Sequence, residues 1–150
     1  MRVVVQRVSQ ASVSIDEKKV ATINEGVLVL LGIETQDTKE DSEWLANKIS
    51  SLRIFSDKDG KMNRSVTEVN GEVIVVSQFT LHAKTKKGNR PSYIKAARPE
   101  QAIPLYKQFK INMSAVIGKD VQSGEFGAVM KVSLTNDGPV TIIIDTKNKE

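Results

Sequence analysis

The run of apolar residues at positions 26–33 constrains the fold of this 150-residue chain most, because it has no polar face that could be exposed to solvent. Its sequence is Gly-Val-Leu-Val-Leu-Leu-Gly-Ile, which is typical of a central β-strand covered on both faces. Apolar and β-branched residues also predict strands at residues 2–8, 11–15, 18–23 and 72–79. We therefore expect a sheet built around one fully buried strand.

Two helices are expected to cover this sheet. The first follows Asp37 or Thr38, either of which can cap it, and carries an apolar stripe with helical spacing. This stripe consists of Leu45, Ile49 and Leu52, with Trp44 beside it. The second helix spans residues 99–117 and stops at Gly118, and Pro104 either delays its regular start or kinks its first turns.

The C-terminal part predicts two more strands, at residues 131–135 and 140–145. The residues between them favour turns: Asn136, Asp137, Gly138 and Pro139. A hairpin connection is therefore expected there. Two helices among many strands predict a mixed α/β fold with layered sheets and both helices packed on one side. The length predicts a single domain over residues 1–150.

The composition excludes several classes of protein. The chain has no cysteine, so disulfides, thiolate nucleophiles and cysteine-ligated metals are excluded. The first apolar run stops after three residues, too early for the core of a signal peptide. The longest apolar stretch, residues 27–31, is too short to span a bilayer. We therefore expect a cytoplasmic protein without a membrane partner.

Positive charge gathers in one segment, although the formal net charge is only +4. Residues 83–99 contain no acidic side chain. Gly88 and Pro91 predict that residues 84–98 form mainly a loop. Their basic residues are Lys84, Lys86, Lys87, Arg90, Lys95 and Arg98. Such a patch attracts polyanions. Tyr93 lies in the same segment, where it either stacks on an unpaired base or anchors the loop to the core.

His82 is the only histidine of the chain. One histidine cannot build a multi-histidine metal site, and no Gly-x-Ser-x-Gly motif supplies a nucleophile for it to activate. A surface or strand-end position is therefore favoured for His82 over the role of a catalytic base.

Polar and apolar residues alternate where the strand at residues 72–79 ends. In an extended strand, Ser77 and Phe79 point to one face while Gln78 and Thr80 point to the other. Strand ends often carry sites in layered α/β proteins. Hydroxyl side chains at such an end also satisfy nearby backbone groups, so from these residues alone both interpretations stay open.

Several short segments, taken in their order along residues 1–145, resemble the D-aminoacyl-tRNA deacylase family. Each segment is weak by itself, whereas the ordered set is specific. The segments include Gly26-Val27-Leu28-Val29-Leu30-Leu31-Gly32-Ile33, Leu52-Arg53-Ile54-Phe55, Gly60-Lys61-Met62-Asn63, Ser77-Gln78-Phe79-Thr80-Leu81, Lys87-Gly88-Asn89-Arg90-Pro91-Ser92, Phe126-Gly127-Ala128-Val129-Met130 and Asn136-Asp137-Gly138-Pro139-Val140-Thr141.

The resemblance implies a homodimer with a barrel-like sheet arrangement that hydrolyses the ester between a D-amino acid and the terminal ribose of tRNA. Glycine mischarged on tRNA would be accepted because it has no side chain to reject, whereas L-aminoacyl-tRNA would be rejected. The activity would thus be chiral proofreading in translation. The resemblance implies neither a cofactor nor a metal.

The resemblance also assigns Ser77, Gln78, Phe79 and Thr80 to one signature of the catalytic pocket. Thr80 is the obvious candidate for a nucleophile. An aminoacyl ester is activated, however, so positioning and oxyanion stabilisation can suffice. We favour a pocket in which the backbone amides around Phe79 and Thr80 hold the substrate, while the ribose 2′-hydroxyl assists the attack by water.

The second signature implied by the resemblance is Gly138-Pro139, joined by a cis bond and reaching into the site of the partner subunit. Its carbonyl groups would crowd the position that an L side chain takes. Arg7 resembles the family residue that helps fix this motif. Phe126 and Met130 match residues near the pocket.

The basic segment is the expected tRNA contact, through Lys84, Lys86, Lys87 and Arg90. Two alternatives remain at this stage. The first is a non-catalytic RNA-binding module that uses the loop at residues 84–98, and turnover at substoichiometric protein would separate it from an enzyme. The second is a metal-independent esterase for small molecules, which predicts no salt dependence and no need for the tRNA body.

Overall fold

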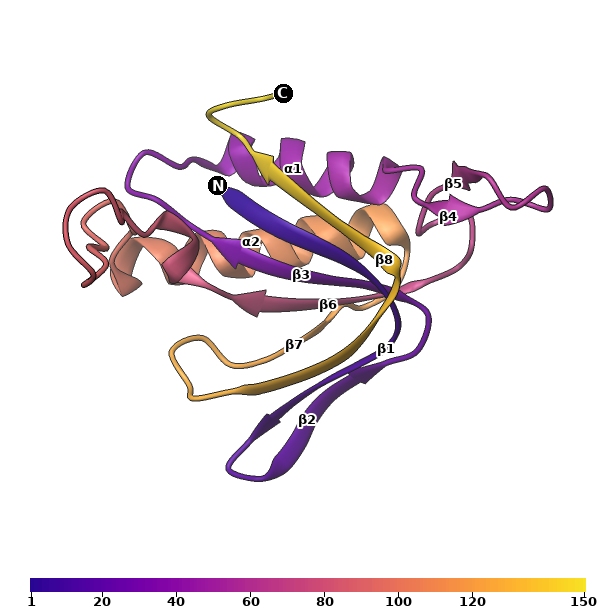
Figure 1. The fold of residues 1–150 in the computed structure, drawn as a ribbon, viewed down its shortest axis with the longest axis horizontal. Coiled ribbons are helices and arrows are strands. Elements are labelled where there is room, and N and C mark those ends of the chain that lie inside the picture. The colour runs from indigo at the N-terminus through magenta and orange to yellow at the C-terminus, as the bar shows by residue number, and fades with distance from the viewer.

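A computed structural model describes residues 1–150 and mixes strands with two α-helices and one 3₁₀ turn (Figure 1). The strands are β1 (Arg2–Ile15), β2 (Lys18–Ile23), β3 (Gly26–Gly32), β4 (Phe55–Ser56), β5 (Met62–Arg64), β6 (Glu72–Ser77), β7 (Gln122–Ser123) and β8 (Lys131–Asp145). The helical elements are α1 (Lys39–Ser51), η1 (Phe79–His82) and α2 (Pro99–Ile117). Neither α-helix combines the length and the apolar character that crossing a membrane requires.

Two long antiparallel strands, β1 and β8, form the spine of the main sheet. The other edge of β1 is shared, since β3 pairs with its residues 2–8 and β2 with its residues 11–15. Beyond β3, the strands β6 and β7 add in parallel. Register shifts within the β1–β2 and β1–β8 pairs accompany the strong curl of this sheet, which forms a nearly closed barrel (Figure 1).

The curled sheet has a core on each side, and β3 contributes to both. Val27, Val29 and Leu31 join the core that α1 and α2 cover, together with residues such as Leu45 and Phe109. Leu28 joins a second core inside the curl. The prediction of a central strand buried on both faces is therefore confirmed, as is the mixed α/β class with both helices packed on one side of the sheet (Figure 1).

The helix boundaries agree with the predicted signals, with two refinements. Thr38 is the N-cap of α1 and forms a capping box with Asp41, whereas Asp37 turns away and binds the buried amino group of Met1. The helix α2 begins at Pro99 and continues through Pro104, and Gly118 ends it in the left-handed conformation. The loop predicted at residues 84–98 is also confirmed, and its strand-like contacts are two isolated bridges, Lys84–Ser92 and Glu34–Ala96.

The predicted hairpin at residues 136–139 is wrong. β8 continues through this stretch, and its two halves pair with β1 rather than with each other. Between the Gln6–Thr141 and Val8–Asn136 pairs, a single residue of β1 stands opposite four residues of β8, so the turn-forming residues make a wide bulge. The Asn136 side chain bridges the bulge, because it accepts a hydrogen bond from the Val140 N–H at 3.0 Å and donates one to the Thr141 hydroxyl at 2.9 Å.

Candidate active site

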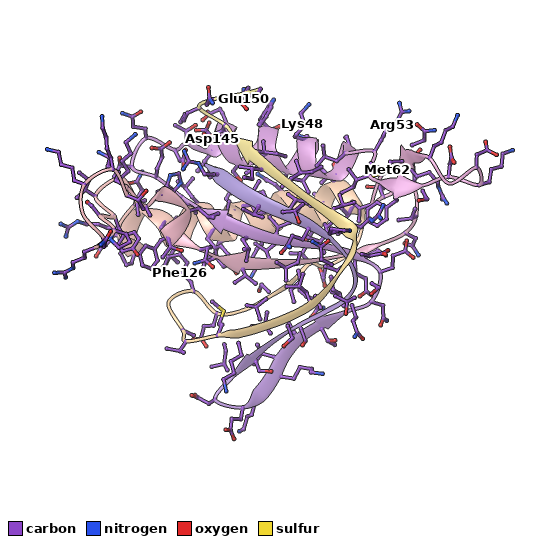
Figure 2. The ribbon with its side chains drawn as sticks, in the orientation of Figure 1. Lys48, Arg53, Met62, Phe126, Asp145 and Glu150 are labelled. Carbon is purple, nitrogen blue, oxygen red and sulfur yellow. The ribbon has the colours of Figure 1, made fainter.

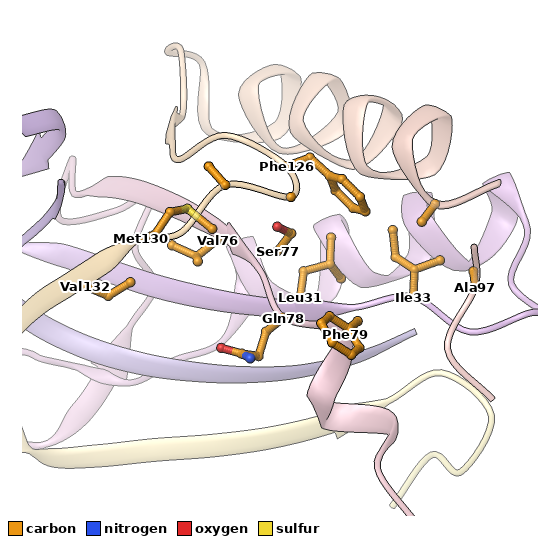
Figure 3. Close-up of a pocket in the computed structure, with 13 residues that line it drawn as sticks. Leu31, Ile33, Val76, Ser77, Gln78, Phe79, Ala97, Phe126, Met130 and Val132 are labelled. Atoms are coloured by element: carbon orange, nitrogen blue, oxygen red, sulfur yellow. The ribbon is translucent and has the colours of Figure 1, made fainter. Parts of the chain in front are cut away.

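A mainly apolar cavity of about 280 Å³ lies between the ends of β3 and β6, the start of α2 and the segment at residues 124–130. Figure 3 shows Phe126 pointing across it toward Leu31 and Ile33. The polar side chains of its lining are Ser77 and Gln78. The other lining residues include Val76, Phe79, Ala97, Met130 and Val132. The cavity therefore offers an apolar chamber with a few polar groups at one wall, as small-molecule sites do.

The polar wall forms where the chain leaves β6. The Gln78 N–H still donates to the Leu31 carbonyl at 2.8 Å, but the Leu81 N–H turns back to the Gln78 carbonyl at 3.2 Å, which starts η1. This turn crosses closely over Gly32, where a Cβ atom would lie 3.0 Å from both the Gln78 carbonyl oxygen and the Leu81 Cβ. A side chain at position 32 would therefore push the wall away from β3.

The predicted strand thus ends two residues early, at Ser77, and the predicted division into two faces is wrong. Ser77, Gln78 and Phe79 all line the cavity, because the 3₁₀ turn replaces the alternation of a strand. Thr80 does not line it, and its hydroxyl oxygen accepts a hydrogen bond from Gln78 Nε2. The side chain of Thr80 is therefore engaged in holding the wall.

The backbone of η1 presents donors at the same wall. The first N–H groups of a helical turn have no partner within that turn, and Gln78 makes no side-chain cap. The amide groups of Phe79 and Thr80 occupy this position. Such unpaired donors are suited to hold a carbonyl or oxyanion oxygen.

Tyr106 of α2 supports the opposite side of the cavity. Its hydroxyl donates to the Val75 carbonyl at 3.2 Å, and its ring lies 5.7 Å from that of Phe126, measured between centroids. Burial raises the pKa of the Tyr106 phenol, so the hydroxyl keeps its proton and remains a donor. Phe126 is thereby packed against a rigid helix.

The basic loop meets the cavity through an aromatic pair. The ring of Tyr93 stands edge-on to that of Phe79, with the centroids 5.0 Å apart, and both rings are partly exposed. Tyr93 therefore ties the loop to η1 rather than to the hydrophobic core. Lys86, Lys87 and Arg90 are exposed in the same loop.

Gly138 and Pro139 do not line the cavity of their own chain. Their peptide bond is cis, and both residues are exposed on the bulge of β8. Arg7 lies beside them, because its Nε donates to the Asp137 carbonyl at 2.9 Å and its Nη1 to the Ile54 carbonyl at 2.6 Å. The structure therefore brings Arg7 to the bulge. Within one chain, however, Gly138-Pro139 stays away from the cavity that Ser77, Gln78 and Phe79 line.

His82 differs from its predicted position at the surface or a strand end. It ends η1 and is buried, with 3% of its surface exposed, because the turn folds its ring against Gly32. Its Nε2 atom is inaccessible and has no hydrogen-bond partner.

Comparison with known proteins identifies the family. The sequence profile of the D-Tyr-tRNA(Tyr) deacylase family matches residues 4–145. The chain belongs to this family. Proteins named D-aminoacyl-tRNA deacylase from Flavobacterium psychrophilum and Bacteroides fragilis are 66% and 62% identical to it, and each alignment covers all of both chains. The resemblance recognised from the ordered motifs is thereby confirmed.

Two solved structures share the fold of this chain. A chain described as c-Myc DNA Unwinding Element Binding Protein is 40% identical, with a TM-score of 0.91 over 97% of this chain and 98% of that one. A probable eukaryotic D-amino acid tRNA deacylase shares the fold with a TM-score of 0.81, at 19% identity over 95% of this chain and 97% of that one. The fold is therefore retained at low sequence identity.

Proposed function

We propose that residues 1–150 form a single D-aminoacyl-tRNA deacylase domain that acts in the cytoplasm, where aminoacyl-tRNA is used. One observation carries the proposal: in a member of this family, Ser77, Gln78 and Phe79 wall a cavity beside unpaired turn amides. The products are free D-amino acid and tRNA. Glycine on tRNA is a further substrate, since it presents no side chain to exclude.

The reaction needs little from side chains. Water attacks the ester carbonyl carbon, the bond from that carbon to the ribose oxygen breaks, and the proton lost by water passes to the leaving ribose oxygen. The Phe79 and Thr80 amides stabilise the oxygen that gains charge, and the ribose 2′-hydroxyl assists the attacking water. The cavity positions the amino acid, and positioning is itself a large contribution for an activated ester.

Thr80→Ala tests this assignment. We expect kcat to fall by less than about tenfold, because the Thr80 hydroxyl orients Gln78 and performs no bond-making step, whereas loss of a general base costs ~10²-fold or more. Single-turnover deacylation of D-Tyr-tRNA measures the effect. Thr22→Ala, the same change at an exposed threonine of β2 that does not line the cavity, is the control. Abolished activity with fold and substrate binding intact would make Thr80 the nucleophile.

The homodimer is part of the same proposal. Gly138-Pro139 lies on β8, which pairs only with β1 and so has an open edge, and Ile143 of this strand is 70% exposed. Long open edges favour pairing with another chain. The motif of one subunit would enter the cavity of the other, where its carbonyl groups crowd the position of an L side chain.

The basic loop supplies the proposed tRNA contact through Lys84, Lys86, Lys87 and Arg90. We expect Lys84→Ala/Lys86→Ala/Lys87→Ala to weaken tRNA affinity at least about tenfold and to reduce the salt slope by roughly 0.7 for each lost phosphate contact. Titrations at several salt concentrations measure both quantities. The control removes the same charge from exposed lysines elsewhere, namely Lys18, Lys19 and Lys58. An unchanged affinity would remove this loop from the tRNA interface.

A further inference from the structure

A second cavity, of about 300 Å³, opens at the other end of η1. We call it the His82 cavity, because His82 lines it together with Lys84, Lys95 and Glu34. Phe79 begins η1 at the candidate active site and His82 ends it three residues later, which is roughly 6 Å along a 3₁₀ axis. One or two nucleotides can bridge such a separation.

The charges of the His82 cavity are not balanced. Arg2 also lines it, but its guanidinium is paired with Asp145 at 2.8 Å. Lys147 is likewise paired outside the cavity, with Asp41 at 2.7 Å. The ammonium groups of Lys84 and Lys95 have no carboxylate partner within 4.0 Å, and Glu34 is the one unpaired carboxylate that faces them. The unpaired groups therefore carry an excess of positive charge, which favours an anion.

The backbone around these two lysines is held in place. The Lys84 N–H donates to the Ser92 carbonyl at 2.8 Å, and the Ser92 N–H donates back to Lys84 at 3.0 Å. The Lys95 carbonyl accepts the Thr35 N–H at 3.1 Å. Both lysines thus start from fixed positions at the cavity rim, which lowers the entropic cost of binding a ligand there.

His82 adds a donor of defined position. Its Nε2 is buried without a partner, and buried N–H groups that lack an acceptor are rare, so in the neutral ring the proton belongs on Nδ1. Nδ1 makes no hydrogen bond within the chain and belongs to a side chain that lines the cavity. An anion in the cavity would satisfy this donor and both lysines.

We propose that the His82 cavity binds a phosphate group of the tRNA acceptor end, near the nucleotide that carries the ester. The inference rests on the proposed deacylase function and adds a subsite to it. Phosphate accepts charge-assisted hydrogen bonds from lysines and can also accept a hydrogen bond from an imidazole N–H. The subsite would bind the nucleic acid without touching the ester, so it contributes to KM and leaves kcat unchanged.

The double variant Lys84→Ala/Lys95→Ala tests the subsite. We expect its KM for D-Tyr-tRNA to rise about tenfold with kcat unchanged, while its KM for D-tyrosyl-adenosine, which has no phosphate, stays at the wild-type value. His82→Phe keeps an aromatic ring, removes both nitrogens and is expected to show the same split. The control Lys18→Ala/Lys19→Ala removes the same charge from β2, which lies away from the basic loop (Figure 1). It should leave the KM for D-Tyr-tRNA and the KM for D-tyrosyl-adenosine unchanged.

Inorganic phosphate is the second probe. It should raise the KM of the wild-type protein for D-Tyr-tRNA, have less effect in Lys84→Ala/Lys95→Ala, and leave D-tyrosyl-adenosine hydrolysis unaffected. Equal losses on both substrates, or equal effects in the β2 control, would overturn the subsite. Phosphate inhibition of D-tyrosyl-adenosine hydrolysis would also overturn it, because phosphate would then occupy the ester cavity.

Binding of uncharged tRNA separates failure of the subsite from failure of the proposed function. If wild-type protein hydrolysed neither substrate, the deacylase proposal would fail, yet phosphate competition against uncharged tRNA would still test the His82 cavity. Competition in wild type that is lost in Lys84→Ala/Lys95→Ala supports the subsite, and identical competition in both proteins contradicts it.

The two cavities lie in the same half of the molecule. Figure 2 shows Phe126, which lines the candidate active site, and Asp145, which lines the His82 cavity, in the half away from Arg53 and Met62.

Discussion

Replacing Gly138 with alanine is expected to lower kcat/KM for D-Tyr-tRNA about 100-fold, the scale on which small displacements of positioning groups act. Gly138 has a φ of +136°, which L side chains rarely adopt. An added Cβ would lie 2.9 Å from Val140 Cγ2 and 3.0 Å from Arg7 Nη2. The bulge would therefore shift, and Arg7 would lose its place against the Asp137 carbonyl.

The assay compares D-Tyr-tRNA with L-Tyr-tRNA, since a displaced motif should also weaken the exclusion of the L substrate. Gly118→Ala is a matched control, because Gly118 has a φ of +74° but no atom within 4 Å of an added Cβ. That variant should keep the wild-type rate per folded molecule. Wild-type activity and selectivity in Gly138→Ala would contradict a role for the bulge in the site.

Asp37→Ala is expected to lower the free energy of unfolding by about 3 kcal/mol, the cost of breaking a buried ion pair. The Asp37 carboxylate is fully buried and binds the amino group of Met1, which is buried as well. It also accepts the Glu34 N–H at 2.7 Å. The substitution would leave the Met1 ammonium without its carboxylate inside the protein.

Urea unfolding followed by circular dichroism measures this loss. Asp59→Ala is the control, because Asp59 is exposed in the turn between β4 and β5 and its removal should change stability by no more than about 0.5 kcal/mol. A loss below about 1 kcal/mol in Asp37→Ala would mean that the buried pair contributes little to the fold.

Local patterns predicted those elements whose signals lie within the element itself. The apolar run at residues 26–33 required burial on both faces. The capping preference of Asp37 or Thr38 was enough to place the start of a helix there, and the structure selects Thr38. The bulge of β8 was not predictable in this way. Asn136, Asp137, Gly138 and Pro139 have turn preferences, and only pairing of β8 with the distant β1 determines that they form a bulge rather than a hairpin.

In the candidate site, too, some features were predictable from local sequence and others depend on contacts between distant parts of the chain. Ser77, Gln78 and Phe79 were found as a motif, but the turn of η1 depends on close approach to Gly32, which no local pattern reveals. Leu31 and Ile33 line the cavity although they were assigned only to a buried strand. Residues 31 and 33 are two positions apart, so their side chains point to the same face of the strand. At the end of β3 this face leaves the core and lines the cavity, and the alternation was therefore the one sequence feature that could have assigned both residues to the site.

Turnover of chirally defined substrates tests the central claim most directly. Wild-type protein is mixed with an excess of D-Tyr-tRNA or L-Tyr-tRNA, and the amino acid released is counted per protein molecule. The account predicts many releases from D-Tyr-tRNA and an intact L-Tyr-tRNA pool over the same time. Release of no more than one D-tyrosine per protein, or equal hydrolysis of both substrates, would contradict it.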